Sequence, residues 1–179
     1  KKVAITGSRD VVAVTEADDV RAGHEPLQAY ERLIEEAQGP TDGLSVNWTA
    51  TGELRAAAST EGERWLHLAV DATLPLTCQR CLTPVSVLLE SDRWFRFVAD
   101  EATAEAQDDE AEEDLLVESR EFDLHALIED ELLMALPMVP MHDECPVEVK
   151  MAAVDADFEE AVAAKPNPFA ALAGLQKKS

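Results

Sequence analysis

The chain has 179 residues, of which 46% are hydrophobic and 5% aromatic, so it can build one substantial core. Its 15 basic and 37 acidic residues give a net charge of −22, which disfavours broad non-specific binding to nucleic acid and favours a basic protein partner. No apolar run approaches the roughly 20 residues of a membrane span, and the first residues show no apolar core of a secretory signal. We therefore expect no membrane association.

The odd number of cysteines bears on the compartment. Three cysteines without a secretory context indicate reduced thiols and a cytoplasmic protein.

Helical periodicity appears first over 26–37, where Pro26 suits a first turn and Gly39-Pro40 ends the run. From Leu44 the period changes to alternation. Three β-branched and aromatic runs, 44–59, 64–76 and 85–100, are joined by turn signals and predict an antiparallel meander.

The segment 100–121 carries eleven acids and one arginine without an apolar period. Self-repulsion predicts a solvated, disordered insertion there. A helix over 124–136 follows, with Asp123 as its N-cap and Pro137 as its end.

The last residues read "KPNPFAALAGLQKKS", in which Asn167 and Pro168 predict the start of a short C-terminal helix. The sequence thus predicts an α+β fold, with an antiparallel sheet packed by flanking helices. We expect a single domain over 1–165, including the acidic insertion, and a docking segment over 166–179.

Cysteine spacing offers the clearest chemistry. Cys78 and Cys81 lie two residues apart in "LPLTCQRCLTPV", between two predicted strands. A redox pair usually needs a helix N-terminus to lower the pKa of its first thiol, and Thr83-Pro84 leaves little room for one. Arg80, between the two cysteines, is the one neighbouring cation that would stabilise a thiolate, and this is thin support. Redox catalysis is therefore disfavoured.

The segment "MHDEC" places His142 and Cys145 at a similar short spacing. Together, Cys78, Cys81, His142 and Cys145 make a Cys₃His set, a known combination for structural zinc. The alternative is that the cysteines are small buried hydrophobes and that no metal binds. Both interpretations stay open, and no other motif indicates a catalytic site or a small-molecule substrate.

Three stretches in order, "LPLTCQRCLTPV", "DLHALIEDELLMALPMVPMHDEC" and "KPNPFAALAGL", resemble the YceD family of large ribosomal RNA subunit accumulation proteins. The resemblance covers about Thr73 to Leu175. It implies a non-enzymatic factor in ribosome biogenesis that supports synthesis or accumulation of large-subunit (23S) rRNA. It also suggests metal binding near His142 and Cys145.

Two routes to such a role follow from the charge. An acidic surface suits a basic ribosomal protein or a pre-50S particle. Limited rRNA contact through a local cationic patch is the other route, and the candidate residues are Arg55, Arg80, Arg93 and Arg96, with Arg64 in the same region. The alternative functions are a thiol- or zinc-dependent enzyme acting on RNA or protein, and a plain binding module without a ribosomal role.

Overall fold

The computed structural model describes residues 20–56 and 62–149. The chain divides into two units, Lys1–Glu144 and Cys145–Ser179, and every element named below belongs to the first. The predicted tail helix and the boundary at 165 lie outside the described residues. Among the described helices, none is long and apolar enough to cross a membrane.

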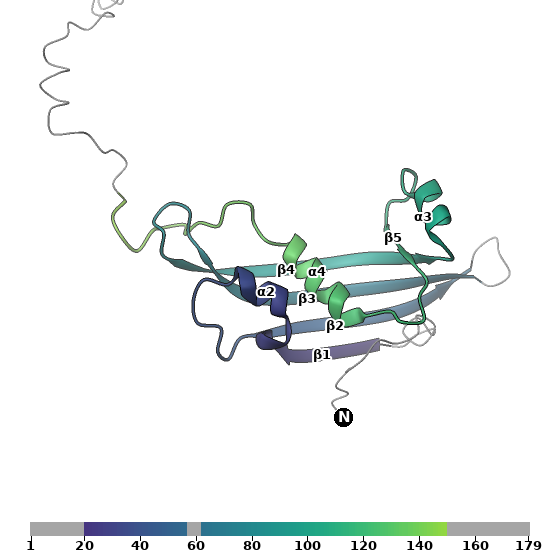
Figure 1. Ribbon diagram of the computed structural model, residues 1–179, viewed down its shortest axis with the longest axis horizontal. Coiled ribbons are helices and arrows are strands. Elements are labelled where there is room, and N and C mark those ends of the chain that lie inside the picture. Colours follow the sequence, from purple (N-terminus) through teal and green to yellow (C-terminus); the bar gives the residue numbers. More distant parts are fainter. Residues whose placement is uncertain (1–19, 57–61, 150–179) are drawn as a thin grey trace, which may run out of the picture. The chain divides into compact units, whose positions relative to one another are not determined.

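A five-stranded sheet forms the centre of the first unit, in the order β1-β2-β3-β4-β5 (Figure 1). The strands are β1 (Val20–Pro26), β2 (Ser45–Arg55), β3 (Glu63–Thr77), β4 (Pro84–Val98) and β5 (Asp114–Val117). The first four pair antiparallel and β5 runs parallel to β4. The predicted α+β meander is confirmed. β1 was not predicted, because "VRAGHEP" lacks a clear apolar alternation.

One face of the sheet carries the core. Residues at alternate positions of the central strands are buried, among them Trp48, Leu68 and Phe95, and the intervening positions are more exposed. Gly23 lies opposite Trp48 in the β1–β2 register, and a Cβ there would come within 2.4 Å of the indole. A side chain at position 23 would therefore displace the tryptophan from the core.

Helices lie against the buried face (Figure 1). The predicted helix over 26–37 is broken into η1 (Leu27–Ala29) and α2 (Glu31–Glu36), because Tyr30 adopts φ −110° and ψ 85°. The later helix is α4 (Leu124–Met134), two residues shorter than predicted. Asp123 caps it as expected, accepting hydrogen bonds from the N–H groups of His125 and Ala126 at 3.0 and 3.1 Å.

The acidic segment differs from the disordered insertion that we expected. It holds α3 (Glu101–Gln107) and β5. Asp100 caps α3 by accepting from Thr103 N at 2.8 Å. Sheet arginines neutralise several of the acids: Arg96 pairs with Glu113, Arg93 with Asp114 and Arg64 with Glu118. The charge of the segment alone overestimates the repulsion among its acids, because it leaves out the arginines that distant strands bring close to them.

A buried carboxylate joins α2 to α4. Glu129 on α4 accepts hydrogen bonds from the backbone N–H groups of Arg32 at 2.8 Å and Leu33 at 3.3 Å. The Arg32 Nε donates to the same carboxylate at 2.7 Å. Tyr30 stacks on His125 beside it, with 4.2 Å between ring centroids. One side chain thus satisfies the first donors of α2 and fixes the pairing of the two helices.

Replacing Glu129 with alanine should lower the free energy of unfolding by about 3 kcal/mol, because it leaves buried N–H groups without an acceptor. The matched control is Asp130→Ala. Asp130 also pairs with Arg32, at 2.6 Å, but it is exposed, so its loss should cost less than about 1 kcal/mol. Urea unfolding of both variants measures the difference, and equal losses would contradict a structural role for Glu129.

Candidate metal centre

The turn between β3 and β4 holds the Cys78–Cys81 pair, as the sequence predicts. Cys78 N donates to Thr83 O at 2.9 Å, and Leu82 N donates to Cys78 O at 2.9 Å. These bonds fold six residues into a tight loop with both sulfurs on it. The Cys81 Sγ also lies 3.1 Å from Thr83 Oγ1. The sequence did not predict this contact, although the spacing of two residues between the cysteine and the threonine is a visible signal.

The segment after α4 crosses this turn. Gln79 N donates to Pro140 O at 2.8 Å, which brings the next residues onto the loop. His142 then donates its backbone N–H to the Cys78 Sγ at 3.5 Å. Its ring Nδ1 lies 3.4 Å from the Cys81 Sγ. Residues more than sixty positions apart therefore meet, as the metal interpretation requires.

Cys145 completes the group. It follows His142 by three residues, so the chain itself limits the distance between them. The candidate ligand atoms of Cys78, Cys81, His142 and Cys145 lie within 4.8 Å of one another. A zinc tetrahedron with bonds of about 2.3 Å would separate two sulfurs by roughly 3.8 Å. The donor set and its spacing thus fit a tetrahedral metal after a small contraction.

Electrostatics favour a thiolate in this group. Burial opposes ionisation of Cys78, but hydrogen bonds from the N–H groups of Cys81, His142 and Arg80 outweigh it and lower its pKa to about 5. The hydrogen bond to Cys78 raises the pKa of His142 above its ordinary value, against the effect of burial. The loop therefore stabilises a negative sulfur, which is the form that binds metal.

The remaining interpretations fit less well. Cys78 is buried, while Cys81 and Cys145 are partly exposed, so the picture of buried hydrophobic cysteines suits Cys78 alone. The same burial works against redox catalysis, because Cys78, the thiol whose pKa is lowered, is not accessible to a substrate. No disulfide joins the three cysteines.

Leu82 follows the second cysteine with φ 60°, the left-handed region that glycine adopts without strain. Its side chain is 75% exposed, so it contributes little packing.

Leu82→Gly should therefore raise the free energy of unfolding by about 1 kcal/mol, through relief of this strain. Glycine at Leu88, which is also exposed but lies within β4, should lower it by a similar amount. Thermal unfolding compares the two. A loss of stability in both variants would show that Leu82 is not strained.

The predicted arginine patch is dispersed. Arg55 and Arg96 approach Trp65 from one face of the sheet, with the Arg55 guanidinium 4.1 Å from the ring centroid. Arg93 points to the other face, where it pairs with Asp114 at 3.1 Å. Arg80 lies in the metal-site turn, 3.9 Å from the sulfur of Met141. Those four residues are not brought together into one cationic surface.

Comparison with known proteins identifies the family of this chain. The family model for large ribosomal RNA subunit accumulation proteins matches residues 66–176, which include the turn, the acidic segment and α4. The chain belongs to this family, YceD. The Haemophilus influenzae protein described as large ribosomal RNA subunit accumulation protein YceD is 39% identical over 111 residues. That match covers 61% of this chain and 63% of the relative, less than two thirds of its length. No solved structure matches.

Proposed function

We propose that the chain supports the accumulation of large-subunit (23S) rRNA as a non-enzymatic factor in ribosome biogenesis. The observation that carries the proposal is family membership over residues 66–176, together with a relative whose name states this role. A net charge of −22 favours action through a basic ribosomal protein or a pre-50S particle rather than by coating rRNA.

The pairing of the arginines supports the same route. Arg55, Arg93 and Arg96 are each engaged by a carboxylate of this chain, at Glu53, Asp114 and Glu113 respectively. A phosphate backbone would have to displace those carboxylates before it gained a guanidinium partner. The alternative, a thiol- or zinc-dependent enzyme, is weakened by the burial of Cys78.

A deletion strain tests the proposal. Loss of the gene should lower the ratio of 23S rRNA to small-subunit rRNA and the yield of large subunits in sucrose gradients. Expression of the wild-type chain should restore both. A deletion strain with normal 23S rRNA and normal large subunits would contradict the role.

For the Cys₃His group we propose a structural zinc. The ion would join the β3–β4 turn to the segment after α4, through Cys78, Cys81, His142 and Cys145. Four protein ligands leave no open position, which is the arrangement of a structural rather than a catalytic site. The staple would supplement the backbone hydrogen bond from Gln79 N to Pro140 O, which already holds the two segments together.

Metal analysis of freshly purified protein should find about one zinc per chain. His142→Asn should lose most of it and lower the Tm by about 10 °C, because the metal supplies folding free energy. His24→Asn is the matched control, because His24 lies on β1 and contacts Asn47 of β2 at 2.6 Å, outside the Cys₃His group. Absence of metal from the wild-type protein, with a Tm unaffected by a chelator, would contradict the staple.

A further inference from the structure

The face of the sheet opposite α2 and α4 has no described helix over its centre (Figure 1). Strand alternation and register place both residues of every second cross-strand pair on this open face. His24, Asn47, Asp71 and Glu90 form one row across four strands, and Ala22, Thr49, Ala69 and Asp92 form the next. A sheet face of this kind is either solvated or covered by a partner.

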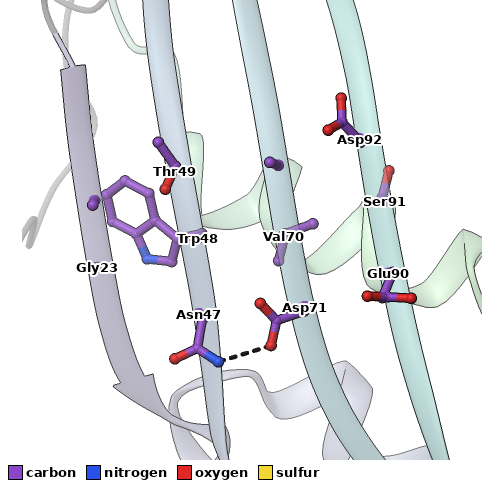
Figure 2. A pocket seen from close by; sticks show the side chains of 11 residues that line it. Gly23, Asn47, Trp48, Thr49, Val70, Asp71, Glu90, Ser91 and Asp92 are labelled. Carbon is purple, nitrogen blue, oxygen red and sulfur yellow. Dashed lines mark hydrogen bonds between the residues drawn. The ribbon is translucent and has the colours of Figure 1, made fainter.

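All residues of the two rows except His24 line an open hollow of about 630 Å³ (Figure 2). Its lining includes three small side chains, Ala22, Thr49 and Ala69. Asp71, Glu90 and Asp92 stand at its side on β3 and β4, and the Asp92 side chain is 72% exposed. The hollow thus has room for side chains from outside and presents carboxylates to them.

Aromatic residues lie beside the hollow. His67 stacks on Trp94 with 4.5 Å between ring centroids, and its Nε2 lies 2.6 Å from Asp92, so the rings and the acids are continuous. Trp65 meets Trp94 edge to face at 6.4 Å. Both tryptophans are partly exposed. Tryptophans beside a polar hollow are frequent anchors of protein interfaces.

The charge of the face selects the partner. The charged residues on this face of β2, β3 and β4 are Glu53, Glu63, Asp71, Glu90 and Asp92, against Arg55 and Arg96. Both arginines are already paired, with Glu53 and Glu113. Asp71 accepts one hydrogen bond, from Asn47 Nδ2 at 2.8 Å. The excess of carboxylates repels phosphate and attracts lysine and arginine side chains.

We propose that this open face docks a lysine- and arginine-rich segment of a protein partner. Its basic side chains enter the hollow toward Asp71, Glu90 and Asp92, and its apolar residues contact Trp65 and Trp94. The inference rests on the proposed function and deepens it, because it names the surface and the chemistry of the partner.

Fluorescence anisotropy tests the proposal with the full chain and a fluorescein-labelled peptide that alternates arginine with serine and ends in leucine. The test variant carries Asp71→Asn, Glu90→Gln and Asp92→Asn. We expect its Kd to rise about tenfold, as three partly exposed charge pairs would give. Trp94→Leu should weaken binding by a further factor of about three.

The matched control removes three exposed acids elsewhere, with Asp108→Asn, Asp109→Asn and Glu110→Gln next to α3. Both triple variants have the same net charge, so long-range attraction is equal and only the local contact differs. The control should change the Kd by less than about threefold. Equal losses in the two triple variants would overturn the proposal.

Further arms identify other occupants. If the chain binds labelled oligouridine and the open-face substitutions change that Kd, the occupant of the face is RNA and not a basic peptide. If light scattering finds a dimer for the wild-type chain and a monomer for the open-face triple variant, the face belongs to a second copy of the chain. Peptide binding that appears only after removal of residues 150–179 would assign it to the chain's own tail. Each of these results overturns the proposal.

Failure here is distinct from failure of the rRNA role. If the open-face triple variant restores normal 23S rRNA in the deletion strain, the docking surface is contradicted and the rRNA role is not. Peptide binding with normal 23S rRNA in the deletion strain would do the reverse.

Discussion

The first unit depends on a carboxylate held away from water. Glu129 joins α4 to the first turn of α2, and the two helices together cover one face of the sheet. A charged group is buried only where donors surround it, so this contact is stable only when both helices are in place. The coverage of one face leaves the other face available. The core and the open face proposed for docking thus both result from burial of only one face of the sheet.

The candidate metal centre lies at one end of the long β3–β4 hairpin. Cys78 lies where β3 ends, and the hydrogen bonds of the turn orient both sulfurs before any metal is needed. His142 arrives through the docking of Pro140 on Gln79. Pre-organised ligands lower the conformational entropy lost on metal binding.

The sequence predicted the meander, the Asp123 cap and the four metal-ligand candidates, because each depends on local periodicity or spacing. It did not predict β1, whose polar alternation becomes a strand only beside β2. Nor did it predict order in the acidic segment, since Arg93 and Arg96 reach Asp114 and Glu113 through the fold rather than through the sequence. The open face was likewise missed, because Asp71, Glu90 and Asp92 become neighbours only when the register is known.

β5 has a consequence for how copies of this protein meet. It is an outer strand of the sheet among the described residues, only four residues long, and it follows directly after a run of acids. An exposed strand edge normally invites pairing with another chain, and short length and like charge are the usual protections. At high protein concentration the acidic segment would keep neighbouring copies from extending one another's sheets. Its charge then acts as a guard against aggregation.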